Sequence, residues 1–253
     1  MIIRVLGSGT SGGIPMIGCT CKVCSSNDPR DQRLRSSILI QVSGCNYAID
    51  AGPDFRQQML REQISQLDAI IFTHPHRDHT AGLDDVRAFN FFQKKPMDLY
   101  LTEAAEASIR KEYHYVFDGG WYPGLPELRF FNITNRPFYI GETKFLPVEV
   151  MHHKMIVFGY RVQNFCYITD ANYIAEIEKA KLTNIKVLII NALRKESHLS
   201  HFNLAEALAL INEVKPEMAY LTHISHQMGL HAEVSKELPS NVQLAYDGLK
   251  IEL

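Results

Sequence analysis

Residues 73–79 of the chain read Thr73-His74-Pro75-His76-Arg77-Asp78-His79. It places three imidazoles and one carboxylate within six positions, in the spacing H-x-H-x-D-H, which is too dense a set of metal ligands for a casual surface feature. The run before it, residues 67–72, is apolar and of strand length, and the run after it, residues 81–89, is typical of the start of a helix. The sequence therefore predicts a metal site on a rigid turn between a strand and a helix.

The spacing favours two metal ions over one. Alternate side chains of an extended stretch lie on the same side, so His74 and His76 point together and can bind one ion. Asp78 and His79 lie beyond the turn and can bind a second ion. Imidazole suits Zn, Fe or Mn, and the carboxylate adds negative charge. The alternative, a set of solvated turn histidines, is disfavoured because the whole chain has only 11 histidines.

Composition excludes several classes of protein. The 253 residues are 46% hydrophobic and 21% charged, an ordinary globular profile, and the net charge of −2 gives no basic excess for nucleic-acid binding. No apolar run approaches the roughly 20 residues needed to cross a bilayer, and the first residues do not have the pattern of a signal peptide. We expect a cytoplasmic protein without a membrane or nucleic-acid partner. Since no linker or repeat is visible, we predict a single domain over residues 1–253.

A second candidate site is the C-x-C-x-x-C stretch near the N-terminus. In a reducing compartment, clustered cysteines are more typical of metal binding than of disulfides. Cys19, Cys21 and Cys24 are one ligand short of the four that zinc prefers. His226 lies three residues after His223, so one imidazole can face each of two sites. These three cysteines and His226 predict a closed structural zinc site.

Other candidate ligands stand where further predicted strands end. Residues 143–150 run into His152 and His153, residues 165–169 end at Asp170, and residues 217–221 precede His223. Adjacent strand residues point to opposite faces, so the residues alone leave the choice between His152 and His153 open. Asp50 ends the predicted strand 46–50 and is either a partner that orients a ligand histidine or a turn cap. Helices are expected over residues 54–62, 83–92, 102–115, 173–180 and 203–214.

The whole pattern resembles the metallo-β-lactamase superfamily. Its H-x-H-x-D-H signature matches at all four positions, and the later His, Asp and His follow in order. The resemblance implies an α/β fold, an αββα sandwich of two mixed sheets flanked by helices, with the metals at one edge. It implies that His74, His76 and His152 hold one ion, that Asp78, His79 and His223 hold the other, and that Asp170 bridges them. In similar sequences the ligand stands seven residues before the Gly of a Gly-Tyr pair, so Gly159-Tyr160 favours His152.

The combination of C-x-C-x-x-C with H-x-x-H resembles one branch of this superfamily, the phosphoribosyl cyclic phosphodiesterase-like enzymes of the carbon–phosphorus lyase pathway. This implies a phosphodiesterase that hydrolyses a small cyclic or diester phosphate through a dinuclear metal-bound hydroxide. Two divalent ions, Zn or Mn, and one structural Zn are expected. That branch has a further histidine near the substrate phosphate, and His201 occupies its place, with His198 as the second choice. The candidate catalytic residues are His201 and Asp78.

Two other functions stay open. An endonuclease that processes the 3′ end of transfer RNA would usually need a basic extension, which is not visible here. A non-catalytic ligand-binding protein of the same fold, as in cofactor biosynthesis, usually lacks ligands, whereas this set is intact. The sequence also leaves open whether two copies form a homodimer, and whether the aromatic segment 113–126 serves packing, covers the site or contacts a partner.

Overall fold

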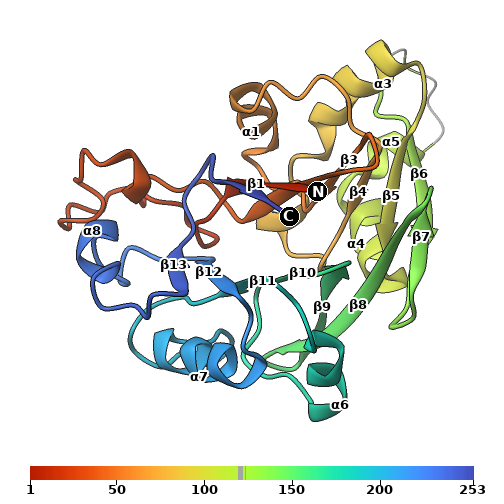
Figure 1. Ribbon diagram of the computed structural model, residues 1–253. Helices are drawn as coiled ribbons and strands as arrows, with labels where there is room; N and C mark the ends of the chain where they lie inside the picture. Colours follow the sequence, from red (N-terminus) through yellow and green to blue (C-terminus); the bar gives the residue numbers. More distant parts are fainter. Residues whose placement is uncertain (119–121, 123) are drawn as a thin grey trace.

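Two seven-stranded sheets lie face to face in the computed structural model, which describes residues 1–118, 122 and 124–253 (Figure 1). The first sheet has the order β14-β1-β2-β3-β4-β5-β6 and the second has the order β13-β12-β11-β10-β9-β8-β7. Each sheet is mixed, because strands β3 to β6 and β10 to β13 pair in parallel and the others pair antiparallel. The first sheet comprises β1 (Ile2–Gly7), β2 (Ser37–Val42), β3 (Cys45–Ile49), β4 (Ala69–Ile71), β5 (Met97–Leu101), β6 (Leu128–Asn132) and β14 (Lys250–Glu252). The second comprises β7 (Phe138–Ile140), β8 (Thr143–His152), β9 (Met155–Val162), β10 (Phe165–Ile168), β11 (Val187–Asn191), β12 (Met218–Thr222) and β13 (Val242–Leu244).

The inner strands are continuous apolar runs because both of their faces are buried. On β2, Ile38 and Ile40 belong to the core between the sheets, whereas Leu39 belongs to the core beneath the outer helices. The same alternation holds on β4, where Ile71 faces the other sheet and Ile70 faces outward. Three apolar clusters follow, one between the sheets and one on the outer face of each.

Helices cover both outer faces. In Figure 1, α1 and α3 lie on one side of the paired sheets, and α6 and α7 lie on the other. This arrangement confirms the predicted αββα sandwich. The helices are α1 (Phe55–Arg61), α2 (Arg77–Thr80), α3 (Arg87–Gln93), α4 (Glu103–Glu112), α5 (His114–Phe117), α6 (Glu176–Lys179), α7 (Leu204–Val214) and α8 (His231–Val234), with short 3-10 helices at Pro29–Asp31, Leu83–Val86 and Ala180–Leu182.

Three predicted helices differ from the observed ones. The 83–92 segment is a 3-10 turn that leads into α3. The 102–115 segment begins as expected, with the Thr102 side chain accepting a hydrogen bond from Ala105 N, but it divides at Tyr113 into α4 and α5. The 173–180 segment starts later, because Tyr173 forms a β-bridge with Met151 and its backbone is therefore not free to coil. The aromatic segment 113–126 lies partly outside the described residues.

No helix among the described residues combines the length and the apolar character needed to cross a membrane.

Candidate metal centre

Predicted ligands from both sheets meet where strands end. His74 and His76 follow β4, His152 is the last residue of β8, and His223 follows β12. Asp50, Asp170 and His223 have φ angles of 67°, 58° and 56°, in the left-handed region that favours glycine. Such backbone conformations persist only where the surroundings fix them, and they gather at functional sites. The left-handed turn at each strand end redirects these side chains toward a common centre.

The first group joins His74, His76 and His152, whose ring nitrogens all lie within 4.8 Å of one another. His74 Nε2 and His76 Nδ1 are 3.0 Å apart. His153 has an exposed side chain, and its backbone N–H donates to Asn172 Oδ1. The structure therefore brings His152, and not His153, to the other two rings.

The second group joins His74, His79 and Asp170 within the same 4.8 Å limit. His79 Nε2 lies 3.3 Å from Asp78 Oδ2 and 3.3 Å from Asp170 Oδ2. Ligand atoms about 2.1 Å from a tetrahedral ion are about 3.4 Å apart, so this spacing fits a shared ion. His79 Nε2 is buried and has no hydrogen-bond partner among the described residues. A nitrogen that faces two carboxylates in this way fits a divalent cation.

Neighbouring groups fix the orientation of three ligand rings. His79 Nδ1 lies 2.7 Å from Asp50 Oδ2, and His152 Nδ1 lies 2.8 Å from the Ser200 carbonyl oxygen. His74 Nδ1 lies 2.9 Å from Thr73 Oγ1, whose hydroxyl also contacts Asp50. A proton on each Nδ1 satisfies all three contacts and leaves each Nε2 free to bind a metal. Of the two roles left open for Asp50, the contact with His79 favours the orienting partner over the turn cap, whereas the sequence carried no signal for Thr73 or Ser200.

Two of the predicted ligands lie outside the compact ligand groups. Neither Asp78 nor His223 belongs to a compact ligand group among the described residues. His223 Nδ1 lies 3.3 Å from Asp170 Oδ2 and 3.1 Å from Ser36 Oγ, and its Nε2 lies 3.2 Å from Thr10 Oγ1. Both ring nitrogens therefore have hydroxyl neighbours. The sequence carried no signal for Ser36, while Thr10 belongs to the glycine-rich stretch of residues 7–13 that follows β1.

Burial and opposite charges set the protonation states. Burial alone would lower the pKa of His79, but the Asp170 and Asp50 carboxylates raise it well above its usual value. Burial would raise the pKa of Asp170, but His223 and His79 lower it well below its usual value. Burial and the neighbouring His79 lower the pKa of His74 well below its usual value. The lowered pKa values of Asp170 and His74 favour an ionised carboxylate beside a neutral imidazole, a donor pair that suits a divalent cation.

His201 lies between the two groups. Its ring centroid is 4.6 Å from that of His152 and 4.8 Å from that of His223. Its Nδ1 is buried without a hydrogen-bond partner among the described residues and lies 3.7 Å from Asp170 Oδ1. Because His201 also falls within 4.8 Å of His152 and Asp170, its position suits either a ligand or a group that meets the substrate. Burial and the neighbouring His223 lower its pKa to about 3.

The cysteine cluster is assembled as well. Cys19, Cys21, Cys24 and His226 place their ligand atoms within 4.8 Å of one another. His226 Nδ1 lies 3.3 Å from both Cys19 Sγ and Cys21 Sγ. The Cys24 backbone N–H and the His226 ring lower the pKa of Cys21 to about 6, which favours the thiolate that binds metal. Three sulfurs and one imidazole in this arrangement fit a tetrahedral zinc.

Two glycines allow the motif turn to pack closely. The Ala51 N–H donates to the His79 carbonyl, and the Gly82 N–H donates to the Ala51 carbonyl. A Cβ added at Gly52 would lie 2.0 Å from the Asp78 carbonyl oxygen, and one at Gly82 would lie 2.2 Å from the Gly52 carbonyl oxygen. The turn that carries Asp78 and His79 is therefore held against the segment after β3 by contacts that a larger residue would block.

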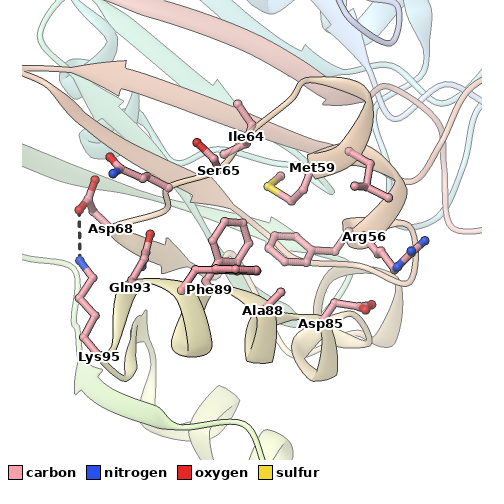
Figure 2. A pocket seen from close by; sticks show the side chains of 14 residues that line it. Arg56, Met59, Ile64, Ser65, Asp68, Asp85, Ala88, Phe89, Gln93 and Lys95 are labelled. Carbon is pink, nitrogen blue, oxygen red and sulfur yellow. Dashed lines mark hydrogen bonds and ion pairs between the residues drawn. The ribbon is translucent and has the colours of Figure 1, made fainter. Parts of the chain in front are cut away.

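A wide groove of about 880 Å³ lies elsewhere, between α1 and α3 on the outer side of the first sheet. Figure 2 shows Met59, Ile64 and Phe89 within it and the Asp68–Lys95 ion pair at one end. None of the predicted metal ligands lines it. This groove is therefore separate from the histidine and aspartate cluster described above.

Comparisons with known proteins agree with this geometry. The model of the β-lactamase superfamily domain matches residues 46–224, which include the motif and every predicted active-site ligand. A crystal structure described as a new diphosphatase from the PhnP family is 38% identical, covers 100% of this chain and 97% of its own, and has a TM-score of 0.93. The structure of Zn²⁺-bound PqqB from Methylobacterium extorquens is 19% identical over 100% of both chains with a TM-score of 0.81, which shows the fold alone.

One relative is similar along nearly the whole of this chain but is about twice as long. An octanoyltransferase from Porphyromonas gingivalis is 38% identical over 249 residues, which are 97% of this chain and 50% of that protein. This chain spans about half the length of that relative, so the octanoyltransferase activity of the whole protein is not assigned to this chain. The family model and the diphosphatase structure decide the assignment: the chain belongs to the metallo-β-lactamase superfamily of hydrolases, in its PhnP-like branch.

Proposed function

We propose that this protein is a phosphodiesterase that hydrolyses a small cyclic or diester phosphate. The observation that carries the proposal is the joint presence of two ligand groups, the histidine and aspartate cluster and the separate cluster of Cys19, Cys21, Cys24 and His226. A diphosphatase of the PhnP family with 38% identity over nearly the whole of both chains supports phosphate chemistry. The substrate is proposed as a class, because no described side chain identifies one compound.

The ligands are proposed in two active-site sets and one structural set. His74, His76 and His152 would hold one divalent ion, Zn or Mn, while Asp78, His79 and His223 would hold the other, with Asp170 between them. Two such ions supply an acidic water as nucleophile and positive charge that stabilises the anionic transition state. Cys19, Cys21, Cys24 and His226 would hold a structural zinc.

The chain's own groups orient this centre and assist the leaving group. Asp50, Thr73 and Ser200 hold the Nδ1 atoms of three rings, which keeps the opposite nitrogens directed inward. His201 lies beside the rings of both sets, where it can bind the phosphate. It can donate a proton to the departing oxygen when the negative charge of a bound phosphate raises its pKa, which is about 3 without one. Asp78 is proposed to act within the second set as both ligand and catalytic carboxylate.

The test is hydrolysis of bis(p-nitrophenyl) phosphate and of a 2′,3′-cyclic nucleotide by protein whose metals have been counted. We expect about three ions per chain, from the ligand sets proposed above, and turnover that His76→Ala abolishes. His201→Ala should keep all the ions and lose turnover; loss of an ion would instead make His201 a ligand.

Two results would favour the other functions. Cleavage of a precursor transfer RNA at its 3′ end, with neither small phosphate hydrolysed, would indicate the endonuclease. Full metal content without turnover of any of these substrates would indicate a ligand-binding protein of this fold.

A further inference from the structure

The loop between β11 and α7 presents His201 to the metal centre. It spans residues 194–201 and is closed at its base, where Leu193 N–H donates to the Phe202 carbonyl at 2.9 Å and Leu204 N–H donates to the Arg194 carbonyl at 2.8 Å. Between these two contacts the loop carries both His198 and His201. Its conformation therefore decides where the His201 ring lies.

Few apolar contacts hold the middle of this loop. The side chains from Lys195 to Leu199 are exposed, and Leu199 has 70% of its surface accessible. On the side of the metal centre, the Ser200 carbonyl accepts from His152 Nδ1 at 2.8 Å, and the Leu199 carbonyl accepts from Asn172 Nδ2 at 3.1 Å. A segment with so little buried apolar surface depends on such polar contacts for its order.

On the opposite side the loop is held by Arg194. Its Nη2 donates to the Ser197 carbonyl at 3.0 Å, and its Nη1 donates to Gln227 Oε1 at 2.8 Å. One planar guanidinium thus spans the loop and a second segment, which a lysine with a single ammonium cannot reproduce. Arg194 Nε is buried and has no hydrogen-bond partner among the described residues, so the group is held by these two contacts.

The second segment is the one that carries the cysteine-cluster histidine. Gln227 directly follows His226, whose Nδ1 lies 3.3 Å from Cys19 Sγ and Cys21 Sγ. The same segment is also tied to the base of the loop, because Ser225 N–H donates to the Leu193 carbonyl at 2.9 Å. The position of Gln227 is therefore set by the closure of the cysteine cluster.

We propose that Arg194 is a positioning residue that, with Gln227, couples the cysteine cluster to the loop that presents His201. The cysteine cluster then has a role beyond stability, since it orders one side of the active site. This inference rests on the proposed function for the role of His201, but the coupling itself is a property of the loop and can be measured without a substrate.

The experiment measures cleavage of the metal-loaded protein by a glutamate-specific protease. Glu196 lies exposed within the loop, and Glu142 lies exposed in the turn between β7 and β8 as an internal reference. We expect Gln227→Ala and Arg194→Lys to speed cleavage after Glu196 by about tenfold, the effect of one lost hydrogen bond, and to leave cleavage after Glu142 unchanged. Equal acceleration at both sites would mean general destabilisation and would overturn the proposal.

Matched variants separate coupling from a general defect. Gln227→Glu keeps an acceptor for Arg194 and should behave as the unchanged protein does. Lys195→Gln removes the neighbouring cation, which pairs with Glu237 at 2.6 Å, and should also have no effect. Cys21→Ser should speed cleavage after Glu196 but should add little in the Gln227→Ala background. Additive effects in that double variant would overturn the coupling.

Turnover is a separate readout. If the chain hydrolyses a phosphate ester, Gln227→Ala should lower kcat by about tenfold and Gln227→Glu should restore it, with the active-site metals retained. If no phosphate ester is turned over, the proposed function fails, yet the protease result still decides the coupling. Unchanged cleavage after Glu196 in Gln227→Ala would refute the coupling even in an active enzyme.

Discussion

Asp50→Asn should weaken metal binding without removing a ligand. The Asp50 carboxylate is fully buried and accepts from Thr73 N, Thr73 Oγ1 and His79 Nδ1 at 2.7 to 3.1 Å. An asparagine has one oxygen and one NH₂ group. If the NH₂ faces His79, it meets the Nδ1 proton and favours the tautomer whose proton blocks Nε2, the atom proposed to bind the ion. If the NH₂ faces Thr73, it meets the backbone N–H.

The magnitude follows from the contact that is lost in either orientation. A hydrogen bond to a charged group contributes about 1.5–3 kcal/mol, which corresponds to a roughly 10- to 100-fold change in an equilibrium constant. Loss of a partner that orients a metal ligand typically costs about the same factor in metal affinity. We therefore expect one active-site ion to bind about 10- to 100-fold more weakly in Asp50→Asn.

The assay is competition for zinc against a chromogenic chelator. Asp98→Asn is the matched control, because it removes a carboxylate of the same sheet that pairs with Arg129 at 2.7 Å on the surface. The control should bind all its ions as the unchanged protein does. Equal affinities in Asp50→Asn and Asp98→Asn would refute the argument that the Asp50 contact fixes the His79 tautomer.

Two further predictions concern stability. Gly52→Ala should lower the free energy of unfolding by about 1–3 kcal/mol, because its Cβ would lie 2.0 Å from the Asp78 carbonyl oxygen, whereas Gly12→Ala, with its nearest neighbour at 3.7 Å, should have little effect in the same denaturation experiment. Burial and the Arg33 guanidinium lower the pKa of His231 to about 4, below its usual value of about 6.5. The neutral ring therefore contributes fully to the free energy of unfolding above about pH 6.5, and this contribution is lost as the pH falls toward 4. Between pH 7 and pH 5.5 the free energy of unfolding should fall by about 1 kcal/mol more in the unchanged protein than in His231→Gln. A difference in unfolding free energy between the two proteins that stays constant with pH would contradict this.

The fold was readable from the sequence because its strands are buried on both faces. Runs such as Ile38-Leu39-Ile40 are apolar at every position, as expected for strands that contribute to the core on both faces of a sheet. The helix boundaries were less readable. The segment 173–180 has the composition of a helix, but the pairing of Tyr173 with Met151 holds its start extended. Only the tertiary structure reveals that contact.

Part of the arrangement of the candidate site could be predicted from the sequence, and part could not. The spacing of His74 and His76 predicts that their rings point together, and the two nitrogens do lie 3.0 Å apart. No pattern in the sequence predicts the positive φ angles of Asp50, Asp170 and His223. Each is a non-glycine residue that its surroundings hold in this conformation. For the same reason, the hydroxyls around His223 could not be predicted, since Ser36 is far from it in the sequence.

The glycine-rich loop after β1 explains why two separate ligand groups lie so close together in this fold. Gly9 forms β-bridges with both Arg35 and Ile224, and a Cβ at Gly9 would lie 2.9 Å from the Arg33 side chain and carbonyl. Only a glycine lets this segment approach residues 33 and 34 so closely, and its second bridge, to Ile224, ties the same segment to the loop after β12. That approach brings Thr10 to His223, and farther along both segments it brings the three cysteines to His226. The H-x-x-H spacing after β12 therefore lets one short loop place His223 beside Thr10 and His226 beside the cysteines, which is the geometry that the proposed coupling requires.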